Sequence, residues 1–226
     1  MGVAVQESLL DMCDDGPVLG ALGRCVRRTP LDHGAWVDLR PGWLAGSGAV
    51  FGRLAEAVPW QAEKRHMYDK VVDVPRLTFF YGEDEALPDP VLAAAREALN
   101  AHYGLELGEP FRTAGLCLYR DGRDSVAWHG DTIGRGSSED TMVAILSLGT
   151  PRPLLLRPRG GPGGSSPPES AEPRGGGARP LRFEVGHGDL LVMGGSCQRT
   201  WEHAVPKTSQ PVGPRISVQF RPRGVR

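Results

Sequence analysis

The sequence lacks the features that mark several large classes of protein. None of its apolar runs approaches the roughly 20 residues that a membrane-spanning helix needs. Its four cysteines form no CxxC pair and no zinc-ligand spacing, which argues against a disulfide framework and a zinc finger. The 26 basic and 27 acidic side chains leave a net charge of -1, which neither favours nor excludes a polyanionic partner. We therefore expect reduced thiols and no membrane partner.

Glycine and proline, by contrast, are abundant. The chain of 226 residues has 31 glycines and 20 prolines, well above the combined average of roughly 12%. This excess favours a β protein rich in turns, and 40% hydrophobic with 23% charged residues is typical of a globular domain. The first residues carry Glu7, Asp11, Asp14 and Asp15 where a signal peptide would be apolar, so we expect a cytoplasmic protein. Separately, we expect a monomer.

The hydrophobic pattern predicts one domain with helices near its start. Residues 1–48 show little sustained periodicity, so we expect a loosely structured lead-in to a domain over residues 49–226. Residues 49–58 and 89–100 have apolar side chains at helical spacing. In the second segment Asp89 is suited to be the N-cap, followed by a proline at the first helical position.

From about residue 114 the pattern changes to short β-prone runs between turn signals. The runs are GLCLY, SVAWH, TMVAILSL, PLLLR, RFEV, DLLVM and RISVQF. Residues 158–180 form a Pro/Gly/Ser-rich tract that cannot bury apolar area, so they are predicted to be a flexible insert between two strands.

Two HxD pairs are candidates for metal binding, because this spacing points two side chains to the same face of an extended strand. His187 and Asp189 lie in a glycine-rich cluster before LLVM, which is typical of a tight turn into a strand. His129 and Asp131 instead follow SVAWH. Alternation there puts Val126 and Trp128 on one face, with Ser125, Ala127 and His129 on the other. The pair His187 and Asp189 is therefore interpreted as structural, and the pair His129 and Asp131 as metal ligands.

A third ligand must come from another strand, and His203 lies just after the run DLLVMGG. Two histidines and one carboxylate occupy one face of an octahedral ion and leave positions open, the arrangement of oxygen-activating non-haem Fe(II) sites. The alternative is that His203 is a half-buried histidine bonded to a backbone carbonyl and that His129 lies on the surface.

The last predicted strand separates its side chains by polarity. In RISVQFR, period two places four polar side chains on one face and three apolar ones on the other. The polar residues are Arg215, Ser217, Gln219 and Arg221. Two arginines on a twisted strand could hold opposite ends of a compact dicarboxylate, since the planar guanidinium pairs bidentately with a carboxylate. An edge strand with a solvated polar face is the alternative.

Taken together, these segments resemble the AlkB family of Fe(II)- and 2-oxoglutarate-dependent dioxygenases. Four blocks carry the resemblance: PRLTFFYG at 75–82, LYRDGRDSVAWHGD at 118–131, GDLLVMGGSCQRTWEH at 188–203 and RISVQFR at 215–221. The resemblance implies a double-stranded β-helix, a jelly-roll barrel with supporting helices. It also implies Fe(II), with 2-oxoglutarate and O2 as cosubstrates.

By the same resemblance His129, Asp131 and His203 are the iron ligands. The cosubstrate contacts are Tyr119, Arg215, Ser217 and Arg221, with Arg215 at the distal carboxylate and Arg221 near the keto-acid end. Tyr81 and Trp128 are the expected substrate contacts.

The implied activity is oxidative dealkylation of N-alkylated nucleobases in DNA or RNA, with the base taken out of its stack. Several residues depart from the family pattern: Cys117 and Ser217 replace usual asparagines, Ile133 replaces an acidic residue, and the segment after Tyr81-Gly82 is acidic instead of aromatic. The acidic segment favours single strands over duplex DNA. It also leaves open the same chemistry on a protein or small molecule. A non-catalytic jelly-roll binding protein is a further alternative.

Overall fold

A computed structural model describes residues 16–67, 70–160 and 179–225, with the side chains of 64–73 left out. Residues 1–15 and most of the expected insert at 158–180 lie outside the described residues. None of the helices in the described part of the chain is long and apolar enough to cross a membrane.

The structure is mainly β with supporting helices, which confirms the predicted class. The strands are β1 (Val18–Leu19), β2 (Arg27–Pro30), β3 (Trp36–Arg40), β4 (Leu44–Ala45), β5 (Gln61–Met67), β6 (Lys70–Tyr81), β7 (Phe111–Tyr119), β8 (Val126–His129), β9 (Val143–Gly149), β10 (Arg152–Pro158), β11 (Leu181–Val185), β12 (Asp189–Gly194), β13 (Trp201–Val205) and β14 (Arg215–Pro222). The α-helices are α1 (Ser47–Ala57), α2 (Pro90–Leu107) and α3 (Cys197–Thr200), and short 3₁₀ turns lie at Gly23–Cys25, Asp32–Gly34 and Arg135–Ser137.

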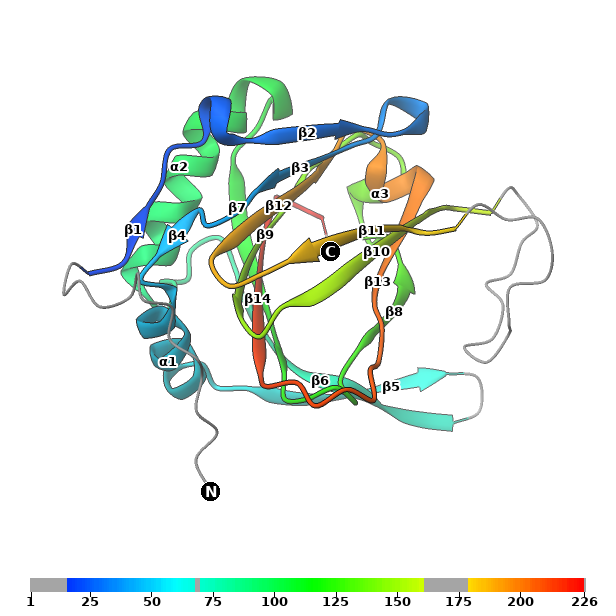
Figure 1. The fold of residues 1–226 in the computed structure, drawn as a ribbon. Coiled ribbons are helices and arrows are strands. Elements are labelled where there is room, and N and C mark those ends of the chain that lie inside the picture. Colours follow the sequence, from blue (N-terminus) through cyan, green and yellow to red (C-terminus); the bar gives the residue numbers. More distant parts are fainter. Residues whose placement is uncertain (1–15, 68–69, 161–178, 226) are drawn as a thin grey trace.

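Two antiparallel sheets face each other and form the barrel (Figure 1). The larger has the order β2-β3-β12-β9-β14-β7-β6-β5, and the smaller has the order β11-β10-β13-β8. Strand β14 lies between β9 and β7, so it is central and not an edge strand. Its four polar positions are at most partly exposed, with Arg215 and Ser217 buried, which excludes a solvated polar face.

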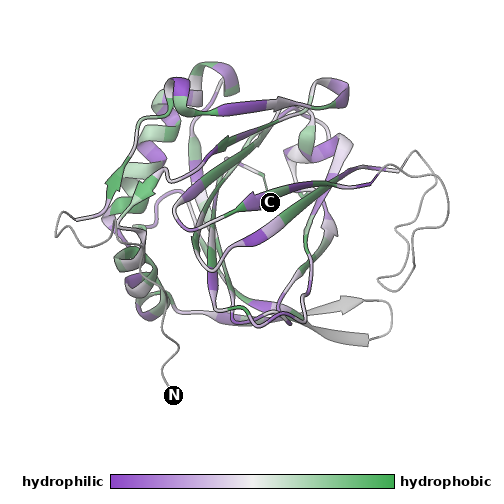
Figure 2. Cartoon of the chain, viewed as in Figure 1, coloured by the Kyte–Doolittle hydropathy of each residue, from purple (hydrophilic) through white to green (hydrophobic). Residues whose placement is uncertain are grey.

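Helices α1 and α2 cover the outer face of the larger sheet, on the left in Figure 1. Apolar residues run along both the strands and the helices (Figure 2). One core cluster joins the helices to this sheet and includes Ile216, Val218 and Phe220; a second lies between the two sheets and includes Tyr119. The apolar face of β14 therefore faces the helices, and its polar face points into the barrel.

Both predicted helices are confirmed, with different ends. Asp89 caps α2 as expected, its Oδ1 accepting a hydrogen bond from the Val91 amide at 2.9 Å. The helix continues beyond residue 100 because Tyr103 and Leu107 add to the same core, and it ends at Gly108 in a left-handed conformation, φ 77°. Strands β5 and β6 form a hairpin that was not anticipated, because β5 (QAEKRHM) has almost no apolar alternation.

The expectation of a loosely structured lead-in is wrong for residues 18–45. Strand β3 joins the larger sheet by pairing with β12 over five residues, and β2 continues the sheet beyond it. Asp38 on β3 is 2% exposed and accepts hydrogen bonds from Arg28 Nε at 2.8 Å and from the Tyr103 hydroxyl at 3.0 Å. This buried network ties the N-terminal strands to α2, a tertiary contact that periodicity cannot reveal.

We expect Asp38→Asn to lower the free energy of unfolding by about 2 kcal/mol, because the buried Asp38 side chain loses the charge that strengthens its hydrogen bonds from the half-exposed Arg28 and from Tyr103. Urea unfolding measures the change. A matched control is Asp121→Asn, since Asp121 pairs with Arg123 at 2.7 Å in an exposed setting. Exposed ion pairs contribute little. Equal effects of the two substitutions would contradict the structural role of Asp38.

Candidate metal centre and anion site

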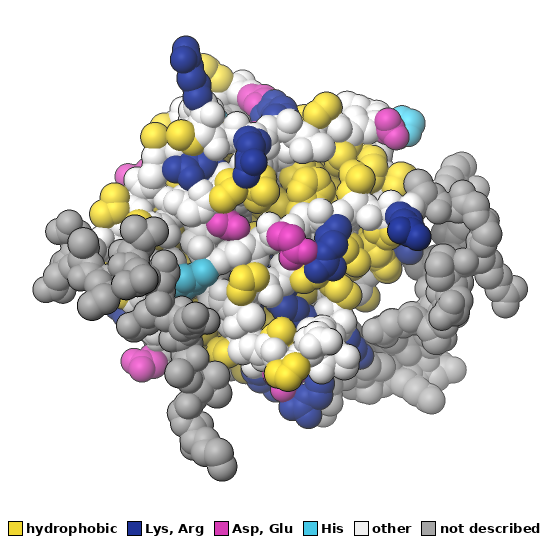
Figure 3. Space-filling view, viewed as in Figure 1, with side chains coloured by type: hydrophobic (Ala, Val, Ile, Leu, Met, Phe, Trp, Pro, Cys, Tyr) yellow, Lys and Arg dark blue, Asp and Glu magenta, His cyan; other side chains and the backbone are white. Residues whose placement is uncertain are grey.

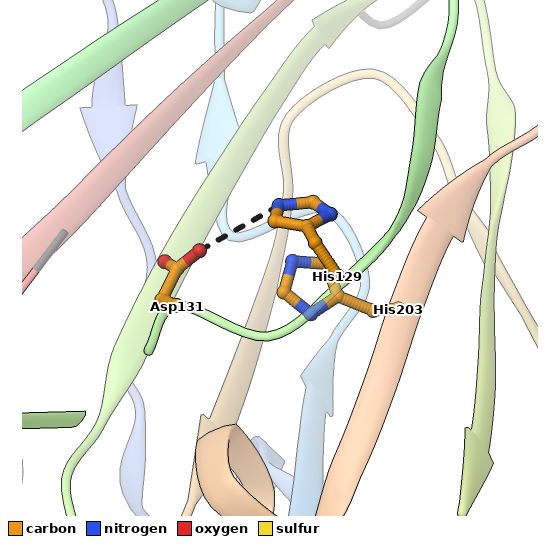
Figure 4. Close-up of side chains that lie close together, drawn as sticks. All are labelled: His129, Asp131 and His203. Atoms are coloured by element: carbon orange, nitrogen blue, oxygen red, sulfur yellow. Dashed lines mark ion pairs between the residues drawn. The ribbon is translucent and has the colours of Figure 1, made fainter. Parts of the chain in front are cut away.

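Three potential metal ligands meet inside the barrel (Figure 4). His129 ends β8, Asp131 lies in the loop after it, and His203 is on β13. One ligand atom of each lies within 4.8 Å of the others, and this is the one such cluster among the described residues. Strands β8 and β13 are neighbours with His129 opposite His203, so sheet pairing brings together residues that are far apart in sequence.

Strand β8 does not alternate strictly, contrary to the prediction for Val126 and Trp128. Its pairing with β13 shifts by one residue. His203 lies opposite His129, and regular pairing would then place Ala127 opposite Val205, but Val126 lies there instead. Val126 therefore packs into the core between the sheets, while the Trp128 ring lies 4.3 Å from the guanidinium carbon of Arg157. Arg157 pairs with Glu202 on the face opposite His203. Trp128 is thus directed away from the metal ligands, and the expectation that it contacts substrate is not supported.

Hydrogen bonding sets which nitrogen of His129 is free. Its Nδ1 lies 2.8 Å from the Ala127 carbonyl oxygen, which can only accept, so Nδ1 carries the proton. The Nε2 atom lies 3.6 Å from Asp131 Oδ1, as the dashed line in Figure 4 marks. A lone pair on Nε2 therefore faces the space between the three ligands.

Asp131 offers one oxygen to this space and uses the other in an ion pair. Arg221 Nε donates to Asp131 Oδ2 at 2.7 Å, and the two side chains are 14% and 4% exposed. Burial alone would raise the pKa of Asp131, but the positive charge of Arg221 outweighs it and holds the pKa well below its usual range. The carboxylate is therefore ionised and suited to bind a cation.

Burial, and after it the neighbouring His129, lower the pKa of His203 to about 3. Burial also lowers the pKa of His129, whose side chain is less buried. Both rings are therefore neutral near pH 7, the form that binds a metal ion.

We expect the metal-free protein to lose stability as the pH falls below about 6.5, the pKa of histidine in an unfolded chain. Between that pH and the folded-state pKa of His203, about 3, the unfolded chain binds the additional proton. The loss is on the order of 1.4 kcal/mol per pH unit for this group. Urea unfolding of the metal-free protein at about pH 7 and about pH 4.5 measures it. In His203→Asn the dependence should weaken; an unchanged dependence would contradict a buried neutral His203.

Beside the metal ligands the barrel holds an arginine without an acidic partner. Arg215 is 2% exposed, and its Nε donates to Ser147 Oγ at 3.0 Å. Its NH1 is buried without a hydrogen-bond partner, and its guanidinium carbon lies 5.2 Å from the Tyr119 ring centroid. A buried unsatisfied donor on a charged group is costly unless an anion completes it. Arg215, with Tyr119 beside it, is therefore suited to bind an anion, and its role at the distal carboxylate of 2-oxoglutarate stays a prediction.

The other two predicted cosubstrate contacts are engaged within the chain. Ser217 Oγ accepts a hydrogen bond from Gln219 Nε2 at 2.5 Å. Arg221, expected at the keto-acid end, is bound to Asp131. Gly115 opposite leaves space for Gln219 and Arg221 of β14, since a Cβ there would lie 3.2 Å from Gln219 Oε1 and 2.8 Å from Arg221 NH1.

The aromatic residue predicted to contact substrate is on the wrong face. Tyr81 is 8% exposed and belongs to the core cluster beneath the helices, where its ring meets Phe79 edge-on at 4.9 Å. In the pairing of β6 with β7, Phe80 lies opposite Gly115. The next residue of β7, Leu116, faces the helices, so Gly115 and Phe80 face the inside of the barrel. The expected contact Tyr81 therefore faces away from the barrel interior, and Phe80 is the aromatic neighbour that faces it.

Three further polar residues in and around the barrel were missed. Leu77 of β6 lies opposite Leu118 of β7, so in this antiparallel pair the preceding Arg76 lies next to Tyr119. The Nε atom of Arg76 is buried and has no hydrogen-bond partner among the described residues. Arg152 is 2% exposed and lies 5.9 Å from the same ring. Gln198 accepts a hydrogen bond from the Asp131 amide at 3.0 Å. Period-two alternation in PRLTFFYG would have grouped Arg76 with Phe80, but nothing local marks Arg152 or Gln198.

A groove of about 510 Å³ opens between the end of β6 and the loop that follows Asp131. Its walls include Phe80, Thr113, Ile133 and Arg223, and none of the three metal ligands. Two of the walls lead toward those ligands, because Thr113 pairs with Arg221 and Ile133 follows Asp131 by two residues. Ile133 is 66% exposed, so an apolar surface is available at the rim.

The second HxD pair is structural, as predicted. His187 Nδ1 accepts a hydrogen bond from the Gly149 amide at 2.7 Å, and Asp189 Oδ2 accepts one from the Gly186 amide at 2.7 Å. Gly188 between them has φ 78°, as a tight turn requires.

Comparison with known proteins identifies the family. Residues 81–221 match the model of the 2OG-Fe(II) oxygenase superfamily. Alpha-ketoglutarate-dependent dioxygenase alkB homolog 3 from Bos taurus is 31% identical over 209 residues, covering 83% of this chain and 68% of the relative. The chain belongs to the AlkB family. DNA oxidative demethylase ALKBH2 from Arabidopsis thaliana is 32% identical over 133 residues, 56% of this chain and 42% of the relative. The OsALKBH1 structure, at 12% identity and a TM-score of 0.56, covers 87% of this chain and 100% of its own and supports the jelly-roll fold.

As an AlkB-family dioxygenase the protein uses Fe(II), 2-oxoglutarate and O2. The donor set fits the metal, since two neutral imidazoles and one carboxylate are the facial set of non-haem Fe(II) oxygenases. The unsatisfied NH1 of buried Arg215 fits a dicarboxylate cosubstrate.

Proposed function

We propose that this AlkB-family dioxygenase removes N-alkyl groups oxidatively from nucleobases of single-stranded nucleic acid. The observation that carries the proposal is that one barrel holds both the cluster of His129, Asp131 and His203 and the buried, unsatisfied donor of Arg215. Relatives named as a DNA oxidative demethylase and as alkB homolog 3 supply the substrate class.

In this proposal each residue of the site has a separate task. His129, Asp131 and His203 hold Fe(II), which supplies the oxygen-activating chemistry when bound. Arg215 holds the distal carboxylate of 2-oxoglutarate, with Tyr119 beside it. Arg221 keeps Asp131 ionised and oriented. In the overall reaction O2 and 2-oxoglutarate are consumed, CO2 and succinate are released, and the alkyl carbon leaves as an aldehyde while the base regains its N–H.

The groove between the end of β6 and the loop that follows Asp131 is the proposed place of the base. Phe80 and the exposed Ile133 provide flat and apolar walls, against which a base can stack once it has left its neighbours. Taking a base out of a duplex costs a few kcal/mol, and a single strand has less to lose. The connection after β6 turns back on itself, because Glu85 accepts a hydrogen bond from the Gly82 amide at 2.6 Å. It has no aromatic side chain to push into a base stack, which favours single strands.

The distribution of charge on the surface indicates that contacts to phosphate groups contribute only modestly to the binding of nucleic acid. On the face shown in Figure 3, Lys and Arg side chains are mixed with acidic and apolar ones. Glu83 on the groove wall pairs with Arg223 at 2.8 Å, so this rim carries no net positive charge. The acidic residues Glu83 and Asp84 also support the second candidate, the same oxidation on a cationic protein or small-molecule substrate.

The test uses protein loaded anaerobically with Fe(II), followed by O2, 2-oxoglutarate and a single-stranded oligonucleotide containing 3-methylcytosine. Succinate and repaired base are measured for the wild type, His203→Ala and the control Glu202→Gln, whose carboxylate faces away from the metal ligands. We expect repaired base from the wild type and control only, and more of it from the single strand than from the matching duplex. Succinate without repair would overturn the substrate class and favour the second candidate. Neither product would overturn the metal assignment.

A further inference from the structure

The backbone of the metal-binding loop is fastened to a neighbouring segment through one side chain. Gln198 Oε1 accepts a hydrogen bond from the Asp131 amide at 3.0 Å in a buried setting. Gln198 is 1% exposed, and a Cβ atom on Gly130 would collide with its carbonyl oxygen. The loop that carries Asp131 therefore rests directly on helix α3.

The same helix leads to the third ligand. Gln198 lies within α3, which is followed at once by β13 with His203. Ser196 Oγ donates to the His33 carbonyl at 2.7 Å and so ties the start of α3 to the N-terminal segment, whereas the bond from Thr200 Oγ1 to the Ser196 carbonyl at 2.9 Å stays within the α3 turn. A displacement of the loop relative to α3 would change the distance between Asp131 and His203.

Asp131 is thus held at both of its ends. Arg221 holds carboxylate oxygen Oδ2, and Gln198 holds the main-chain amide. These two contacts restrict the rotation that would turn Oδ1 away from the histidines. The side-chain nitrogen Nε2 of Gln198 is buried and has no hydrogen-bond partner among the described residues. The bond from the Asp131 amide to Oε1 is therefore the contact that accounts for a buried amide side chain here.

We propose that Gln198 is a positioning residue that keeps Asp131 in the geometry required for metal binding. The proposal rests on the metal assignment of the proposed function. Groups that orient metal ligands without touching the metal typically change metal affinity 10- to 100-fold when they are replaced.

The test is Co(II) binding by absorption titration of the metal-free protein, with Gln198→Met, Gln198→Glu and Thr200→Val. Methionine keeps the length of the side chain but cannot accept the bond, while glutamate keeps the acceptor oxygen. Thr200→Val removes a hydroxyl of α3 that does not contact the loop. We expect about 10- to 100-fold weaker binding in Gln198→Met, and affinities within about threefold of wild type in the other two.

Thermal unfolding of the metal-free variants separates folding from positioning. Gln198→Met and Thr200→Val should unfold at similar temperatures and differ only in Co(II) affinity. Wild-type affinity in Gln198→Met, or equal weakening in Gln198→Glu or Thr200→Val, would overturn the role of Gln198. Absence of Co(II) binding by the wild type would instead overturn the metal assignment on which the inference rests.

Discussion

Asp131→Asn is expected to weaken Fe(II) binding by about 100-fold or more and to abolish succinate formation. The substitution keeps the shape of the side chain but removes the negative charge that faces His129 and the charge that balances Arg221. Replacing a group that only orients a metal ligand already weakens metal binding about 10- to 100-fold, and here the ligand itself loses its charge while Arg221 keeps its own beside the metal site. Anaerobic titration with Fe(II) or Co(II) measures the loss directly.

Glu202→Gln provides a matched control for this substitution. Glu202 precedes His203 in the chain and forms a similar carboxylate–arginine pair with Arg157 at 2.8 Å, but on the face opposite the ligands. It should bind metal as the wild type does. Asp131→Asn with unchanged affinity, or an equal loss in Glu202→Gln, would show that Asp131 is not a metal ligand.

Arg215→Met is expected to raise the KM for 2-oxoglutarate by about 100-fold or more. The guanidinium is buried and its NH1 has no hydrogen-bond partner among the described residues, so its charge is available to a carboxylate. Removing one member of a buried charge pair typically costs 2–5 kcal/mol of binding. Arg215→Lys should restore only part of the affinity, because an ammonium group lacks the bidentate fork. Ser147→Ala, which loses only the hydroxyl that holds Arg215 Nε, should cost about tenfold or less.

Two further measurements make this prediction specific to the cosubstrate. Co(II) affinity of Arg215→Met should stay near that of the wild type, since Arg215 touches none of the three ligands. Burial lowers the pKa of Arg215, which indicates that its charge is unfavourable in this buried position. The cosubstrate-free variant should therefore be at least as stable as the wild type in urea. A normal KM in Arg215→Met would show that the anion site does not hold 2-oxoglutarate.

Much of the site could be predicted because its residues follow local rules. The HxD spacing of His129 and Asp131, the distal His203 and the period-two pattern around Arg215 each depend on a few neighbouring positions. The structure brings these residues into one barrel. The turn at Gly188 and the cap at Asp89 are of the same kind, since both are decided by side chains within three residues.

Alternation alone does not say which face of a strand turns toward the site. Phe80 and Tyr81 are equally aromatic neighbours, and only the pairing of β6 with β7 and the packing of the helices place Tyr81 in the core. In β8 a shift of register reverses the expected face of Val126 relative to Trp128. Such shifts depend on the partner strand, which lies more than 70 residues away in the sequence.

The sequence by itself determined the protein's class, its ligand types and the polarity of each strand face, because these depend on residue identity and on spacing along the backbone. Only the tertiary structure decided how the polar groups pair. Arg221 was expected at the cosubstrate and is bound to Asp131, while Gln198 and Arg152 enter the site region from positions that no local spacing rule marks. The physical reason is burial: inside the barrel a charge must find its partner among whatever the sheets bring near it, and that set is fixed by strand order and register.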